Sequence, residues 1–88
     1  MNNRKIDDII NKAIIKFNLI SPKNMQIKNF KRTQFTKKLD SLNIINLLMS
    51  FEEVIRNKKI IDDMKKQTLY KIFKNYLSIK NFLKKYKL

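Results

Sequence analysis

Residues 35–55 read FTKKLDSLNIINLLMSFEEVI, and this stretch decides the fold that we expect. Its last 17 residues contain no Lys or Arg, although these two residue types make up 21 of the 88 residues. Its apolar residues recur at the three- and four-residue spacing of a helix that buries one face. The pattern predicts a helix over residues 41–56, with Asp40 and Ser41 suited to its first positions. Its predicted core face consists of Ile44, Leu47, Leu48, Phe51 and Ile55.

Leu42, Ile45 and Met49 form a second apolar row beside that core face. A helix that is apolar on more than one side either lies centrally in a bundle or carries an exposed strip for a partner. Both interpretations stay open for these three residues at the level of the sequence. Glu52 and Glu53, near the end of the helix, are likewise either solvated surface charges or contacts for a basic partner.

Composition limits both the fold class and the chemistry. A chain of 88 residues is expected to form a single domain, residues 1–88, with a small core. It has no Gly and one Pro, so it lacks the turn residues that an all-β fold needs, and an all-α fold is favoured. It also has no Cys and no His, which excludes disulfides, the usual zinc sites and a Ser-His catalytic pair. An independent enzyme is therefore disfavoured.

Three further helices are expected around the central one. Residues 3–18 have an apolar stripe of helical period, which predicts a core-facing helix, and a membrane-surface helix is the alternative. A short third helix is predicted from Asp62 or Asp63 to about Asn75, and a last helix is predicted with Ser78 as its N-cap. The stripe of the first helix consists of Ile6, Ile9, Ile10, Ala13, Ile14 and Phe17.

Residues 19–40 form a long, basic connection between the first two predicted helices. A loop of this length in a small domain is either functional or anchored by its own apolar residues. We expect Ile27, Phe30 and Phe35 to anchor it on the bundle. Stacking of the same aromatic residues on nucleobases is the alternative.

The net charge of +14 makes nucleic acid or an anionic surface a partner to be considered. The charge is unevenly distributed, with +6 over residues 1–34, −1 over residues 35–55 and +9 over residues 56–88. Lys, Asn and Ile are all frequent and all have A/T-rich codons, so genome composition can account for part of the basicity. Because no helix has a compact basic face, binding of nucleic acid or a ribosome is kept as the alternative function.

No apolar run approaches the length of a membrane span. Charged and polar residues interrupt the isoleucines near the start of the sequence, so no signal peptide is predicted. The expected location is the cytoplasm.

The Asp-Ser-Leu triplet at residues 40–42, together with Met49, Phe51 and the Glu pair at 52–53, resembles the second helix of the acyl carrier proteins and related phosphopantetheine carriers. Leu39 before the triplet resembles the Leu-Asp-Ser variant of stand-alone carriers, including D-alanyl carriers. The specific part of the resemblance is the stretch from Leu39 to the end of the helix. The coarse order of the predicted helices extends it over nearly the whole chain.

Three features differ from the usual family pattern. Lys37 and Lys38 occupy the region where many carriers have a Gly before the triplet. Asn46 stands where the family often has an acidic residue. The chain as a whole is basic, whereas these carriers are typically acidic.

The resemblance implies a small four-helix bundle of acyl-carrier type, with a long loop between helices 1 and 2 and a short third helix. It implies that Ser41 carries a 4′-phosphopantetheine group from coenzyme A, with Asp40 serving the modifying transferase through Mg²⁺. An acyl or aminoacyl cargo is then held as a thioester on the thiol of that arm. The first turn of a helix is suited to this role, because it holds a hydroxyl rigidly and offers free N–H groups to a phosphate.

The implied partners are a phosphopantetheinyl transferase and the enzymes that load or transfer the cargo. The carrier itself is expected to be monomeric and not to be an enzyme. The residues expected to contact these partners are Leu42, Ile45, Met49, Glu52 and Glu53.

Overall fold

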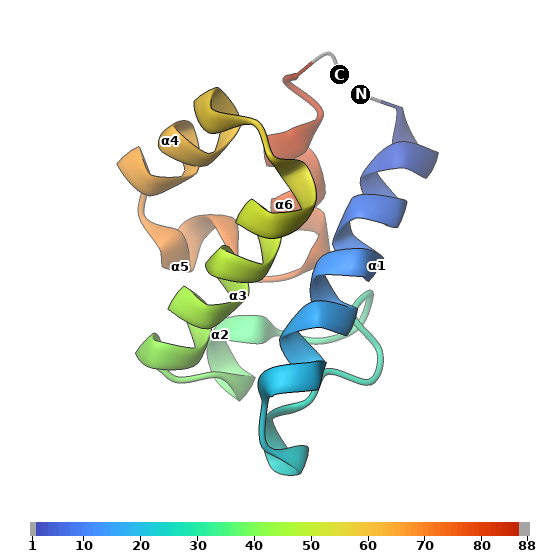
Figure 1. Ribbon diagram of the computed structural model, residues 1–88, viewed down its shortest axis with the longest axis vertical. Coiled ribbons are helices and arrows are strands. Elements are labelled where there is room, and N and C mark those ends of the chain that lie inside the picture. Colours follow the sequence, from blue (N-terminus) through green and yellow to red (C-terminus); the bar gives the residue numbers. More distant parts are fainter. Residues whose placement is uncertain (1, 87–88) are drawn as a thin grey trace.

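Two long helices, α1 (Asn3–Ile20) and α3 (Ser41–Ile55), lie side by side and run in opposite directions (Figure 1). The structure, a computed structural model, describes residues 2–86. All six apolar residues of the stripe predicted in α1 are buried, so that prediction is confirmed. Four of the five residues of the predicted α3 core face are also buried, and Ile55 packs partly buried against the same core. Burial of these two stripes holds the bundle together.

The other helices pack around this pair (Figure 1). Among residues 2–86 there are six α-helices and a single isolated β-bridge, which joins Gln34 to Asn75. The all-α prediction is therefore confirmed, with six helices in place of the four expected. The remaining elements are the 3₁₀ turn η1 (Lys23–Met25), α2 (Phe35–Lys38), α4 (Lys58–Lys66), α5 (Leu69–Ile72) and α6 (Tyr76–Leu83).

The predicted third helix is wrong in its start and in its continuity. The helix begins earlier, at Lys58, because the side chain of Asn57 accepts a hydrogen bond from the N–H of Ile60 at 3.2 Å and so acts as the N-cap. The chain then becomes extended at Gln67 and Thr68, which separates α4 from the one-turn α5. This arrangement buries the apolar residues of α4, Ile60, Ile61 and Met64.

The predicted N-cap of the last helix is also wrong. Asn75 caps α6, since its side-chain oxygen accepts hydrogen bonds from the N–H of Ser78 at 2.9 Å and from the Ser78 hydroxyl at 3.1 Å. Ser78 is therefore the third residue of the helix rather than its cap. The earlier start places Tyr76 in the helix with its side chain buried.

The connection between α1 and α3 is ordered by contacts of its own. The side-chain amide of Asn18 donates to the carbonyl oxygen of Ile27 at 2.9 Å, and its oxygen accepts from the Ile27 N–H at 2.8 Å. Ile27 and Phe35 are buried and Phe30 is partly buried against the core, so the predicted anchoring is confirmed. The connection ends by positioning α2 directly before α3 (Figure 1).

Asn18→Ala removes both bonds to Ile27 and leaves a buried residue with an N–H and a C=O that lack these partners. We expect the free energy of unfolding, measured by urea denaturation, to fall by about 1–3 kcal/mol. Asn11→Ala, at an exposed position of the same helix, serves as the control and is expected to change it by less than about 0.5 kcal/mol. Equal losses in the two variants would show that the Asn18 contact does not order the loop.

Candidate functional site at the start of α3

Asp40 and Ser41 have different roles at the start of α3. Asp40 is the N-cap, because one of its carboxylate oxygens accepts hydrogen bonds from the N–H and the side-chain amide of Asn43, each at 2.9 Å. Ser41 follows as the first residue of the helix and its side chain is exposed. Serine is also a common N-cap residue, but here the cap is Asp40 and Ser41 is the first residue inside the helix.

The hydroxyl of Ser41 is hydrogen-bonded to the hydroxyl of Tyr70 on α5. The two residues lie 29 positions apart in the sequence, and both side chains are exposed, Tyr70 by 46%. Sequence reasoning missed Tyr70. A single exposed tyrosine in a lysine-rich segment gives no indication that it contacts a serine 29 positions away. The break between α4 and α5, which positions Tyr70, is also absent from the sequence-based prediction.

The second apolar row of α3 faces solvent. Leu42, Ile45 and Met49 are 66%, 46% and 55% exposed, so they are not core residues. We call these three residues the apolar ridge. It begins one residue after Ser41 and runs along the outer side of α3, because residues at i, i+3 and i+7 share one side of a helix. An exposed apolar strip beside the candidate site is the kind of surface that a partner protein covers.

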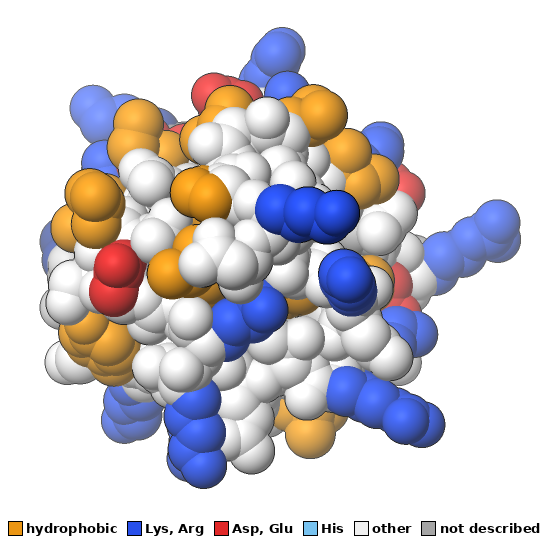
Figure 2. Space-filling model, turned by 90° about the horizontal axis from the view of Figure 1, so that it is seen from below, with side chains coloured by type: hydrophobic (Ala, Val, Ile, Leu, Met, Phe, Trp, Pro, Cys, Tyr) orange, Lys and Arg blue, Asp and Glu red, His pale blue; other side chains and the backbone are white. Residues whose placement is uncertain are grey.

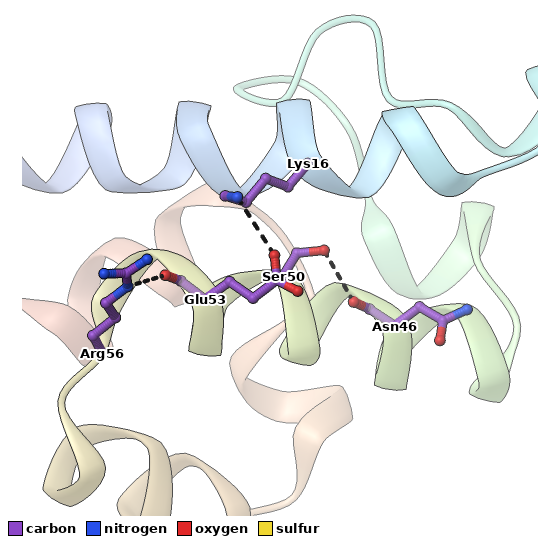
Figure 3. Close-up of polar contacts among 5 residues, drawn as sticks. All are labelled: Lys16, Asn46, Ser50, Glu53 and Arg56. Carbon is purple, nitrogen blue, oxygen red and sulfur yellow. Dashed lines mark hydrogen bonds and ion pairs between the residues drawn. The ribbon is translucent and has the colours of Figure 1, made fainter.

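The two glutamates near the end of α3 both have cationic partners within the chain. Glu52 lies 3.1 Å from the ammonium group of Lys65 on α4. Glu53 lies 3.5 Å from that of Lys16 on α1, and Figure 3 shows this pair joining the two helices. Surface ion pairs of this kind contribute about 0–1 kcal/mol each and can be exchanged for others. Docking of Glu52 and Glu53 on a partner stays a prediction.

Ser50 lies on the side of α3 that faces α1 and is 4% exposed. Its hydroxyl turns back to the carbonyl oxygen of Asn46 at 3.1 Å, as Figure 3 shows, so the buried oxygen is satisfied within the helix. Beyond this point, a groove of about 760 Å³ lies between α1 and the end of α3. Glu53 is the only predicted site residue that lines it, and Ser41 lies at the opposite end of α3.

Lys and Arg side chains surround the end of the molecule at which α1 ends and α3 begins (Figure 2). A hollow of about 440 Å³ at the connection is lined by Lys23, Lys28 and Lys38 together with Asn, Gln and Thr side chains, and by no acidic residue. Lys38 belongs to α2, two residues before Asp40. The connection that leads into α3 is therefore basic.

Within residues 2–86 no three His, Cys, Asp or Glu side chains lie close enough to hold a metal ion. No helix of that range is both long and apolar enough to cross a membrane. In the comparisons with known proteins, no protein-family model, no curated protein and no solved structure matches the chain. The functional conclusion therefore depends on the geometry around Ser41.

Two neighbouring substitutions test whether Asp40, and not the Ser41 hydroxyl, caps the helix. Asp40→Ala is expected to lower the free energy of unfolding by about 1 kcal/mol, because the N–H of Asn43 loses its acceptor. Ser41→Ala is expected to change it by less than about 0.5 kcal/mol, because its hydroxyl is exposed and bonds another exposed hydroxyl, that of Tyr70. Chemical denaturation measures both. A loss in Ser41→Ala as large as that in Asp40→Ala would mean that Ser41 stabilises the helix start.

Proposed function

We propose that this protein is an acyl carrier, to which a transferase attaches 4′-phosphopantetheine at Ser41. One observation carries the proposal above the others: the Ser41 hydroxyl is exposed at the first position of α3 while Asp40 caps the helix. A serine freed from capping, at the start of a helix with a solvent-facing apolar ridge, is what a carrier requires. The protein then acts as a non-catalytic carrier of an acyl or aminoacyl group.

The residues at the start of α3 fit a phosphodiester. The first intrahelical bond is donated by the N–H of Ile44 to the carbonyl oxygen of Asp40 at 3.0 Å. The N–H groups of Ser41 and Leu42 precede it and point out of the helix start, where an attached phosphate can accept from them. The basic side chains of α2, Lys37 and Lys38, add favourable charge close by in the sequence. When bound, the group supplies a thiol for thioester formation, which a chain with no Cys cannot supply itself.

The apolar ridge supports the docking part of the proposal. Its three side chains expose apolar surface that water solvates poorly, so covering it with a partner enzyme is favourable. Glu52 and Glu53 can exchange their lysine partners for those of an enzyme at little cost, because the ion pairs are exposed. In this proposal the ridge supplies affinity and the glutamates orient the encounter.

Binding of nucleic acid is the second candidate function, and the basic hollow lined by Lys23, Lys28 and Lys38 favours it. No aromatic side chain lines that hollow, so it offers phosphate contacts without a stacking platform. It leaves the apolar ridge and the exposed Ser41 without a role. We therefore rank it second.

Attachment is tested by intact mass after incubation with coenzyme A, Mg²⁺ and phosphopantetheinyl transferases of differing specificity. Wild-type protein is expected to gain the mass of one phosphopantetheine, and Ser41→Ala is expected to gain none. Ser50→Ala is the control, because its hydroxyl is buried and bonded within α3, and it should be modified like wild type. No gain with any transferase, together with salt-dependent binding of RNA, would favour the second function.

The ridge is tested by truncating it without disturbing the core. Leu42→Ala and Met49→Ala are each expected to lower kcat/KM of the transferase by about tenfold, the effect of losing one well-buried apolar contact. Thermal unfolding should be nearly unchanged, because both side chains are exposed in the free protein. Leu77→Ala on α6, which is 61% exposed, is the matched control. Equal activity in all three variants would remove the ridge from the docking surface.

A further inference from the structure

Within residues 2–86, the contact between Ser41 and Tyr70 is the one side-chain hydrogen bond that joins the proposed attachment site to a distant part of the chain. Among the described residues, the hydrogen bonds of Asp40 remain within α3. Tyr70 lies on α5, which is anchored in the core by Ile72 and by Phe73 directly after the helix, 3% and 0% exposed. The anchoring holds the phenol at the start of α3.

The bond between the two hydroxyls contributes little to the stability of the fold. Both side chains are exposed, so water can replace either partner when the bond breaks. By contrast, Tyr86 donates to the carboxylate of Asp63 at 2.6 Å, and burial together with that bond raises the pKa of Tyr86 to about 12. The Tyr70 hydroxyl is thus free to serve the chemistry of Ser41 rather than the fold.

We propose that Tyr70 is a positioning residue of the attachment site: it orients the Ser41 hydroxyl before transfer and donates a hydrogen bond to the phosphodiester afterwards. This inference rests on the proposed carrier function and adds a phosphate-binding group from α5, an element outside the resemblance at residues 39–55. A tyrosine is suited to both steps, because its hydroxyl can accept from a serine or donate to an anion.

The bonds that form and break in the transfer determine which of the two hydroxyls can donate a hydrogen bond afterwards. The Ser41 oxygen forms a bond to the phosphorus that carries pantetheine in coenzyme A. The bond from that phosphorus to the 3′,5′-ADP moiety breaks, the electron pair leaves with 3′,5′-ADP, and the hydroxyl proton passes to a base of the transferase. Ser41 then has no proton to donate, so only Tyr70 can be the donor of the pair. The charged oxygens of the phosphodiester are better acceptors than the ester oxygen, so the bond strengthens as it moves to them.

The test compares Tyr70→Phe with Tyr86→Phe, which removes the same atom from a tyrosine whose hydroxyl is bonded to Asp63 on α4. Tyr70→Phe is expected to lower kcat for modification of Ser41 by about two- to tenfold, the effect of one hydrogen bond, with KM nearly unchanged. Its thermal unfolding should match wild type. Tyr86→Phe should be modified at the wild-type rate, even if it is less stable.

A second measurement detects the hydrogen bond between Tyr70 and the phosphodiester in modified protein. The ³¹P resonance of the phosphodiester is expected to differ between wild type and Tyr70→Phe and to be the same in wild type and Tyr86→Phe. If wild type is modified and Tyr70→Phe equals it in both rate and ³¹P shift, the role of Tyr70 is overturned while the carrier function stands. If wild type is not modified by any transferase, both are overturned.

Discussion

The packing of α3 against its neighbours is the constraint on which the rest of the structure depends. One side of the helix is buried in the core, a second approaches α1 at Ser50, and a third faces α4 and α5 through Glu52 and Ser41. The apolar ridge is left to solvent, together with Ser41 at the start of the helix and Glu53 near its end. Because a helix has a fixed periodicity, the core face determines which residues stand on the ridge. The outer surface of α3 is therefore specified by the same pattern that folds the chain.

The acidic residues show how a chain of net charge +14 uses its few carboxylates. Six of the seven have a defined partner, and most of these contacts join different elements. Asp40 caps α3, Glu52 and Glu53 join α3 to α4 and α1, and Asp63 accepts from Tyr86. The other two lie on α1, where Asp8 pairs with Lys12, and Asp7 pairs with Lys31 and accepts from the hydroxyl of Tyr76. The exposed ion pairs among these contacts are individually weak, so they add little to the alignment that the apolar core imposes on the helices.

The parts of the fold that could be predicted from the sequence are those governed by periodicity. Helices α1 and α3 follow long apolar stripes, and their boundaries were predicted within two residues. The caps of α4 and α6 could not be predicted in the same way, because several Asn, Asp and Ser residues near each start are all acceptable locally. Asn57 and Asn75 act as the caps, and the helices that start after them include Ile60 and Tyr76, whose side chains are buried. That choice is made by tertiary packing, which the sequence pattern does not contain.

The same distinction between periodicity and tertiary packing applies to the candidate site. The positions of Ser41 and the ridge follow from the helix that contains them, so residues 40–49 could be singled out from the sequence. Tyr70 could not, because its approach to Ser41 depends on the break at Gln67 and Thr68 that turns α5 back towards α3. A continuous helix in place of α4 and α5 would carry residue 70 onward in the direction of α4. The extended pair between the two helices therefore positions the site as directly as the cap at Asp40 does.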